Sequence, residues 1–196
     1  MSLELVIGPM FSGKSSYLLS TIRLYKKDGL PLFIITSSFD TRYTNESKIV
    51  NHNQDSYMAD IAVKNLKDIS NNPLFLEAKV IIIEEGQFFE NLVEFVLETV
   101  EVYGKHVIVA GLDGDASRKP FGEILDLIPY CDNIIKLKAI CKICSADGII
   151  TDALFTSNKS TIVKTNDSII NVGGADKYEA LCRKHYLESN PSSSTL

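Results

Sequence analysis

The sequence predicts an α/β protein with a parallel sheet covered by helices on both faces, followed by a smaller β-rich lobe. Apolar segments rich in valine and isoleucine alternate with segments that have the apolar spacing of helices, which is typical of a parallel sheet buried on both faces. A glycine-bracketed loop, "GPMFSGKSS", directly follows the first apolar segment. After residue 140 the composition changes, and two spaced pairs of possible metal ligands, one Cys–Cys and one Cys–His, bracket a β-rich stretch that contains Gly and Thr.

Each element of the main sheet follows from a short apolar run. The sequence predicts five strands, at 3–7, 30–36, 78–86, 105–114 and 133–140. It predicts helices over 14–29, 90–104 and 119–130, the first from an apolar stripe made by Leu18, Leu19, Ile22 and Tyr25. Residues 37–60 are polar with little periodicity, so we expect a loop there.

Composition and charge exclude several classes of protein. The 196 residues suit one domain with a small appendage. A net charge of −5 without an obvious basic face argues against a nucleic-acid partner. We expect no membrane span, because no apolar run approaches about 18 residues. The opening "MSLELVIG" has no basic segment typical of a signal peptide, so we expect a cytoplasmic, reducing location.

The glycine loop matches the pattern G-x-x-x-x-G-K-[ST] between a predicted strand and a predicted helix. Such a loop wraps phosphates with backbone N–H groups, and the following helix points its positive end at them. Lys14 would reach the β- and γ-phosphates of ATP, and Ser15 would bind Mg²⁺. The predicted phosphate site comprises Gly8, Pro9, Met10, Phe11, Ser12, Gly13, Lys14, Ser15 and Ser16.

Two acids, Glu84 and Glu85, end the predicted strand 78–86. In nucleotide enzymes one acid at this place holds Mg²⁺, and a neighbouring acid can take a proton from the attacking group. Solvated carboxylates at a strand end are the structural alternative. The residues alone do not assign the two roles, but ligands of parallel sheets bind at such strand ends. We therefore expect the acids and the glycine loop to share one cleft.

The cysteines are arranged as metal ligands. Cys141 and Cys144 form a C-x₂-C pair, and Cys182 and His185 form a C-x₂-H pair. Three thiolates and one imidazole suit a closed tetrahedral Zn²⁺ site with a structural role. Unrelated buried cysteines with a surface histidine are the alternative. Cys131 lies outside both pairs and is expected in the core.

Six motifs in order resemble the type II thymidine kinases, the cellular and poxvirus-like class. They are "GPMFSGKS" (8–15), "DTRY" (40–43), "EEGQFF" (84–89), "RKPFG" (118–122), "CKIC" (141–144) and "GGADKYEALC" (173–182). The match runs from Leu5 to about Tyr186, and the length and departures look closest to a member from a large DNA virus.

The resemblance implies that ATP phosphorylates thymidine to thymidine monophosphate (dTMP), with Mg²⁺ and a structural Zn²⁺. It implies a P-loop NTPase-like (RecA-like) domain over 1–139, a zinc lobe over 140–187 whose lasso loop closes over the nucleoside, and a disordered tail over 188–196. It also implies a homotetramer and feedback inhibition by thymidine triphosphate (dTTP).

The resemblance further implies a role for individual residues. Glu85 would be the general base, Glu84 a ligand of Mg²⁺, and Arg42 a cation on the phosphate side, in addition to Lys14. Asp40 lies beside Arg42 in the same motif. The residues implied in nucleoside binding are Met10, Asp40, Phe88, Leu112, Phe121, Thr151, Gly173 and Tyr178.

Four departures from the family's pattern affect these expectations. Glu84 stands where the family usually has Asp, and Ala116 stands where an aromatic residue is common, which would widen the pocket. The stretch from Thr151 to Tyr178 is longer than in the cellular enzymes, which would make the lasso loop more mobile and weaken inhibition by dTTP. His185 replaces a cysteine of many members and keeps a metal-binding donor set.

Two other classes remain as alternatives. One is a motor or switch ATPase or GTPase built on the same loop, although the chain lacks an N-K-x-D guanine motif. The other is a zinc-ribbon module that binds nucleic acid, which the acidic balance disfavours.

Overall fold

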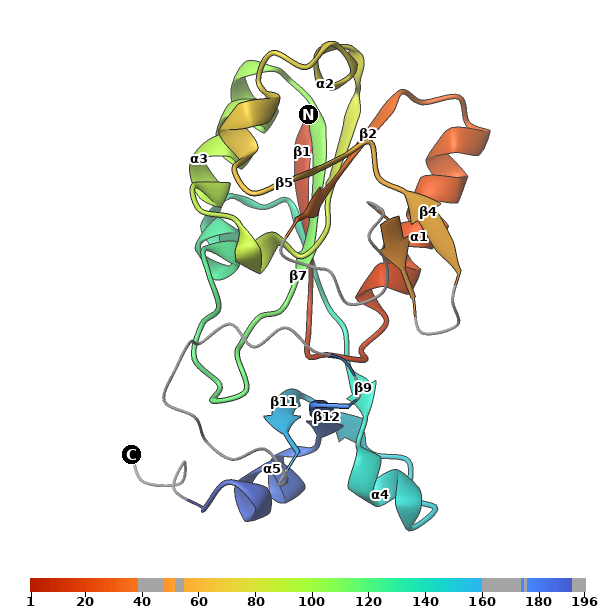
Figure 1. Cartoon of the computed structure of the whole chain (residues 1–196), viewed down its shortest axis with the longest axis vertical. Coiled ribbons are helices and arrows are strands. Elements are labelled where there is room, and N and C mark those ends of the chain that lie inside the picture. The colour runs from red at the N-terminus through yellow and green to blue at the C-terminus, as the bar shows by residue number, and fades with distance from the viewer. Residues whose placement is uncertain (39–47, 52–54, 160–173, 175, 192–196) are drawn as a thin grey trace.

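The computed structural model describes residues 1–38, 48–51, 55–159, 174 and 176–191. Its centre is a six-stranded sheet with the order β5-β2-β6-β7-β1-β8, in which all neighbouring strands are parallel (Figure 1). The strands are β1 Ser2–Ile7, β2 Leu32–Ser37, β5 Ile61–Val63, β6 Val80–Ile83, β7 His106–Gly111 and β8 Asn133–Lys136. Four of the five predicted strands are confirmed. The fifth, 133–140, is divided: 133–136 form β8 of this sheet, and 139–140 form a separate strand in the smaller lobe. The short edge strand β5 was not predicted.

Both faces of the sheet are buried, and alternate residues of each strand serve opposite faces. On β6, Ile81 and Ile83 join one buried cluster, while Val80 and Ile82 join the other. Nearly every position of these central strands is apolar, because neither face meets water. This confirms the expected parallel sheet with two covered faces.

Helices cover each face. Helix α1 (Lys14–Lys27) packs on one face through Leu18, Leu19 and Ile22. The other face carries α2 (Pro73–Glu77), α3 (Leu92–Leu97) and the 3₁₀ helices η1 (Leu66–Ile69) and η4 (Ile124–Tyr130). The predicted helix 90–104 is α3 followed by a π-helical turn, η3 (Glu98–Val102). The expected helix over 119–130 is shorter and 3₁₀, with Pro129 inside it.

The expectation of a loop over 37–60 is wrong in part. Strands β3 (Lys48–Val50) and β4 (Ser56–Met58) pair antiparallel there. Ile49 is fully buried beside α1, and one buried side chain in a three-residue strand leaves little periodic signal. Residues 39–47 and 52–54 lie outside the described part of the chain.

The cysteine-containing lobe has its own small core. Strand β9 (Ala139–Ile140) pairs with β10 (Asp152–Ala153), and β11 (Phe155–Asn158) pairs with β12 (Tyr178–Leu181), both antiparallel. Helices α4 (Lys142–Ala146) and α5 (Arg183–Ser189) flank them. The buried side chains of this core include three cysteines and Tyr186.

The expected start of a disordered tail at residue 188 is wrong. Helix α5 continues to Ser189, and the Asn190 side chain donates a hydrogen bond to Ser157 Oγ (3.2 Å). Residues 192–196 lie outside the described residues. Within the described part of the chain, no helix is both long and apolar enough to cross a bilayer.

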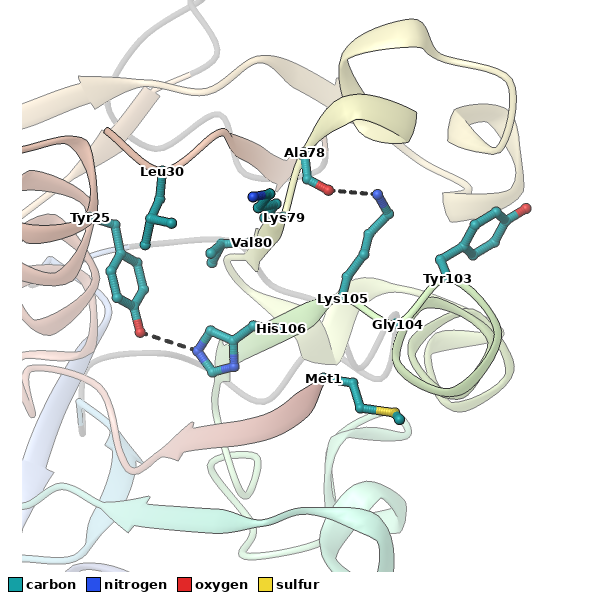
Figure 2. A pocket seen from close by; sticks show the side chains of 10 residues that line it. All are labelled: Met1, Tyr25, Leu30, Ala78, Lys79, Val80, Tyr103, Gly104, Lys105 and His106. Atoms are coloured by element: carbon teal, nitrogen blue, oxygen red, sulfur yellow. Dashed lines mark hydrogen bonds between the residues drawn. The ribbon is translucent and has the colours of Figure 1, made fainter. Parts of the chain in front are cut away.

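The amino ends of the strands line a cavity of about 480 Å³ (Figure 2). Three of its polar side chains are paired: Tyr25 Oη lies 3.2 Å from His106 Nε2, and the buried Lys105 Nζ donates to the carbonyls of Leu76 (2.9 Å) and Ala78 (2.6 Å). Burial lowers the pKa of Lys105. The cavity contains none of the predicted site residues, which follow the opposite strand ends.

Replacing Lys105 with methionine is expected to lower the free energy of unfolding by about 1–3 kcal/mol, because the buried Ala78 carbonyl and the partly buried Leu76 carbonyl lose their donor. Lys79→Met is the matched control, since Lys79 lines the same cavity and is exposed, and we expect a change within about 0.5 kcal/mol. Urea unfolding of both variants measures this. Equal stability of the Lys105 variant and the wild-type protein would show that the hydrogen bonds only offset burial of the charge.

Candidate active site and metal cluster

The glycine loop connects β1 to α1 at the carboxyl end of the sheet. Gly13 has φ 87° and precedes the first residue of α1, so the loop turns into the helix through a conformation that favours glycine. Lys14 Nζ donates to the carbonyls of Gly8 (3.1 Å) and Pro9 (2.8 Å), which folds the lysine back over the loop. The residues therefore have the strand–loop–helix context that phosphate binding requires.

Gly8 is fixed by close packing. Its φ is 153°, and a Cβ placed there would lie 2.5 Å from the Leu137 carbonyl oxygen of the neighbouring chain segment. The Gly8→Ala variant is therefore expected to displace the loop and to weaken binding of ATP by at least about 10-fold, since a loss of about 1.4 kcal/mol suffices for this. Gly29→Ala is the control, because Gly29 also has positive φ, but a Cβ added there would meet no atom within 4 Å. Equal nucleotide affinity of the two variants would contradict this role of Gly8.

The two predicted ligands of Mg²⁺ lie together. Ser15 Oγ donates a hydrogen bond of 2.7 Å to Glu84 Oε1. Glu84 is 6% exposed, although it carries a carboxylate. A hydroxyl and a carboxylate oxygen, side by side next to a phosphate loop, are the kind of hard oxygen ligands that Mg²⁺ takes. Glu84 stands where the family usually has Asp, and its longer side chain makes this contact with Ser15.

Glu85 points to a different partner. Its backbone has φ 55°, a left-handed conformation that is uncommon for residues other than glycine. Its Oε2 accepts a hydrogen bond from Gln87 Nε2. The structure thus separates the two adjacent acids: Glu84 faces Ser15, and Glu85 faces Gln87.

Several residues predicted to line the nucleoside site lie near this strand end. The rings of Phe88 and Phe121 meet edge to face, with centroids 5.5 Å apart. The Leu112 amide at the end of β7 donates to Gln87 Oε1 (3.0 Å). Tyr178 begins β12, in the metal-cluster lobe. Asp40, Arg42 and Gly173 lie outside the described residues.

The phosphate loop and the smaller lobe meet at a threonine that was not predicted. Met10 N donates to Thr156 Oγ1 on β11 (2.9 Å), and Phe11 packs against the core of the lobe. Thr151, the predicted residue, instead uses its carbonyl to accept from Cys141 N (2.8 Å). The sequence carries no periodic signal that distinguishes these two threonines, which lie only five positions apart.

The loop after β7 also docks on the smaller lobe. Tyr186 Oη donates to the Ala116 carbonyl (2.7 Å), and the Arg118 guanidinium lies 4.9 Å from the centre of the Tyr186 ring. Tyr186 directly follows His185 on α5. The smaller lobe therefore holds both the phosphate loop and the loop that contains Ala116 and Phe121.

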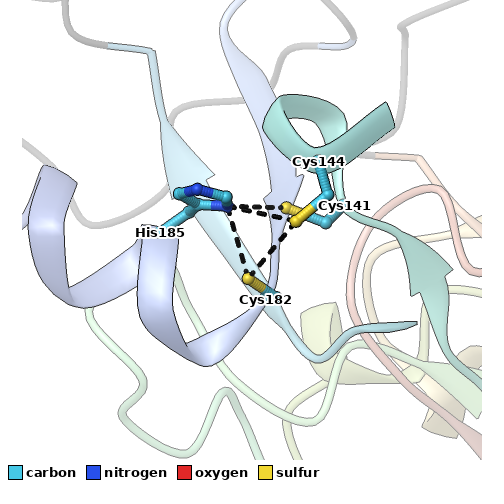
Figure 3. Close-up of side chains that lie close together, drawn as sticks. All are labelled: Cys141, Cys144, Cys182 and His185. Carbon is cyan, nitrogen blue, oxygen red and sulfur yellow. Dashed lines mark hydrogen bonds between the residues drawn. The ribbon is translucent and has the colours of Figure 1, made fainter. Parts of the chain in front are cut away.

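The four predicted metal ligands form one cluster (Figure 3). Their ligand atoms all lie within 4.8 Å of one another, and His185 Nδ1 is 3.4 Å from each Sγ of Cys141, Cys144 and Cys182. A tetrahedral ion with the bond lengths of Zn–S and Zn–N sets these separations at roughly 3.5 Å. The donor set and its spacing therefore fit a metal ion.

The surroundings of the cluster shift the pKa values of two of its thiols in opposite directions. Burial raises the pKa of Cys141, but hydrogen bonds from the Cys144 and Cys182 backbone and from His185 outweigh it and lower that pKa to about 6. A hydrogen bond with Thr151 lowers the pKa of Cys144, but burial and the neighbouring thiols outweigh it and raise that pKa. A thiolate at Cys141 is therefore available near neutral pH, and a bound cation would favour ionisation of the others.

The chain is an α/β protein with a phosphate-loop pattern at the carboxyl end of a parallel sheet. A second lobe, which contains the Cys₃His cluster, contacts that loop. Residues 1–186 match the family described as thymidine kinase, and the chain belongs to the thymidine kinase family.

Relatives from plants, animals and viruses share most of the chain. It is 38% identical to thymidine kinase a of Arabidopsis thaliana, covering 96% of this chain and 76% of the relative. It is 37% identical to the human cytosolic thymidine kinase, covering 95% and 73%. It is 39% identical to a thymidine kinase of variola virus, covering 95% and 97%.

Proposed function

We propose that this protein transfers the γ-phosphoryl group of ATP to the 5′-hydroxyl of thymidine, giving dTMP and ADP. Membership of the thymidine kinase family supports the reaction. The observation that carries the mechanism is the split between two adjacent acids, with Glu84 hydrogen-bonded to Ser15 of the phosphate loop and Glu85 directed elsewhere.

In the proposed mechanism, Lys14 and the loop amides bind the donor phosphates, and Arg42 contributes a further positive charge. Ser15 and Glu84 hold Mg²⁺, which neutralises charge on the transferred group when bound. Glu85 accepts the proton of the 5′-hydroxyl as that oxygen attacks phosphorus. The bond from the γ-phosphorus to the bridging oxygen breaks, and ADP leaves.

Thymidine is proposed to bind between the main sheet domain and the smaller lobe. Phe88 and Phe121 supply flat apolar walls, as nucleoside pockets require, with Met10, Leu112 and Tyr178. Asp40, Thr151 and Gly173 complete the proposed set. The hydrogen bond from Met10 N to Thr156 Oγ1 joins the phosphate loop, and with it Met10, to the smaller lobe.

The metal in the Cys₃His cluster is proposed to be zinc with a structural role. All four tetrahedral positions have a protein donor, which leaves no open position for chemistry. We also propose a division into a nucleotide-binding domain (1–139) and a zinc lobe (140–187).

Four further properties are proposed from the family: a homotetramer, inhibition by dTTP, a cytoplasmic location and an origin in a large DNA virus. Light scattering at several protein concentrations tests the tetramer. The rate of dTMP formation with increasing dTTP tests the inhibition.

The reaction is tested by incubating the protein with ATP, Mg²⁺ and one nucleoside at a time: thymidine, deoxyuridine, deoxycytidine or deoxyguanosine. We expect one ADP for each dTMP, and the other nucleosides show how far Ala116 widens the pocket. Formation of ADP that does not depend on any nucleoside would instead indicate an ATPase.

A further inference from the structure

Gln87 joins the ends of two neighbouring strands through both ends of its side-chain amide. The residue is 3% exposed. Its Oε1 accepts a hydrogen bond from the Leu112 backbone N–H at the end of β7 (3.0 Å). Its Nε2 donates to Glu85 Oε2 after β6.

The orientation of this amide follows from its partners. The Leu112 N–H can only donate, so it must face the amide oxygen, and the amide nitrogen must then face Glu85. A carboxylate accepts in this position. The hydrogen bonds therefore leave one orientation for Gln87 and one role for the Glu85 oxygen that it contacts.

Two glycines leave the space that Gln87 occupies. A Cβ at Gly111 would overlap Gln87 Oε1, and a Cβ at Gly122 would overlap the Gln87 carbonyl oxygen. Gly122 also has φ 61°. The side chain of Gln87 is thus enclosed closely by the end of β7, and its backbone by the segment before η4, so the amide has little room to move.

We propose that Gln87 is a positioning residue: it fixes the Glu85 carboxylate relative to Leu112 in the wall of the nucleoside site. This inference rests on the proposed function, in which Glu85 accepts the proton of the 5′-hydroxyl. A base must lie within hydrogen-bond reach of that proton, and a misplacement of about 1 Å can cost about 10²-fold in rate.

The test compares Gln87→Met, which removes both hydrogen bonds, with Gln87→Glu. The second variant keeps an acceptor for the Leu112 N–H but places a carboxylate against Glu85. We expect kcat to fall about 10- to 100-fold in both variants, while KM for thymidine and for ATP changes less than about 3-fold, because ground-state binding is kept. Thermal melting shows whether each variant is folded. If the methionine variant does not fold, the kinetics of the glutamate variant decide the test.

A double-mutant cycle separates positioning from general stability. In a Glu85→Gln background, measured with radiolabelled ATP, either change at Gln87 should lower kcat by less than about 2-fold further, since it acts through Glu85. Thr99→Val is the control, because it removes a buried hydroxyl that bonds the Phe95 carbonyl (2.7 Å) away from Glu85. Its effect should be equal in both backgrounds.

The outcomes are distinct. An equal loss of kcat from the Gln87 changes in both backgrounds, or a rise in KM with kcat unchanged, would overturn the positioning role while the kinase reaction stands. A wild-type protein without thymidine-dependent turnover, or a Glu85→Gln variant with full kcat, would overturn the proposed function itself.

Discussion

Replacing Glu85 with glutamine is expected to lower kcat for dTMP formation by about 10²- to 10⁴-fold, the usual contribution of a positioned base. The amide is nearly the same size and still accepts a hydrogen bond, but it cannot take a proton at neutral pH. Affinity for thymidine and ATP should change little, because Glu85 is proposed to act only as the 5′-hydroxyl attacks. Steady-state kinetics and calorimetric binding measure the two effects separately.

The matched control is Glu90→Gln. Glu90 is an exposed carboxylate close in sequence and lies outside the predicted site, so this variant should keep wild-type kcat. A Glu85→Gln variant that turns over thymidine as fast as the Glu90 variant would remove Glu85 from the chemical step.

Removing the metal is expected to have the second large effect, since it should unfold the smaller lobe. Structural zinc contributes apparent binding energies of about 10–16 kcal/mol in small zinc domains, and among the described residues of this lobe the core has few buried side chains besides the three cysteines. Activity should be lost as well, because Thr156 holds the Met10 amide and Tyr186 holds the Ala116 carbonyl. Circular dichroism and kinase activity during chelation, followed by restoration with Zn²⁺, measure both losses.

The metal should also leave in acid. The cysteines of the cluster bind metal as thiolates. The pKa of Cys141 is lowered to about 6, so Cys141 is a thiolate above that pH. Protons compete with the metal below it, and they compete at higher pH for Cys144, whose pKa is raised. Zinc affinity should therefore fall steadily as the pH drops through about 6.

Cysteine replacements provide the control for the metal experiments. Cys182→Ser should release zinc, whereas Cys131→Ser should retain it, because Cys131 lies outside the cluster and its thiol bonds the Ile128 carbonyl. Full activity of a metal-free protein would contradict the structural role of the cluster.

Features with a strong local pattern were predictable from the sequence. The β1–loop–α1 unit has an apolar strand, a spaced glycine pattern and a helical stripe, all within residues 2–27. The Cys₃His cluster follows from two short spacings. The strand, the loop, the helix and each cysteine pair are local patterns, whereas the meeting of the two pairs, across 44 positions from Cys141 to His185, depends on the fold.

Features that depend on distant contacts were not predictable. Gln87 became notable only because its amide meets Leu112, 25 positions away in the chain. The contact between Met10 and Thr156 spans 146 positions, and no spacing rule distinguishes Thr156 from Thr151. The separate partners of Glu84 and Glu85 likewise depend on the left-handed backbone of Glu85, which the sequence does not reveal.

The most direct measurement is a crystal structure of the protein with thymidine, Mg²⁺ and a non-hydrolysable ATP analogue. We predict a Glu85 carboxylate oxygen within about 2.6–3.2 Å of the thymidine 5′-oxygen. That 5′-oxygen should lie in line with the γ-phosphorus, and Mg²⁺ should lie beside Ser15 and Glu84. A 5′-hydroxyl that instead contacts Glu84, or that lies beyond the reach of both acids, would contradict this prediction.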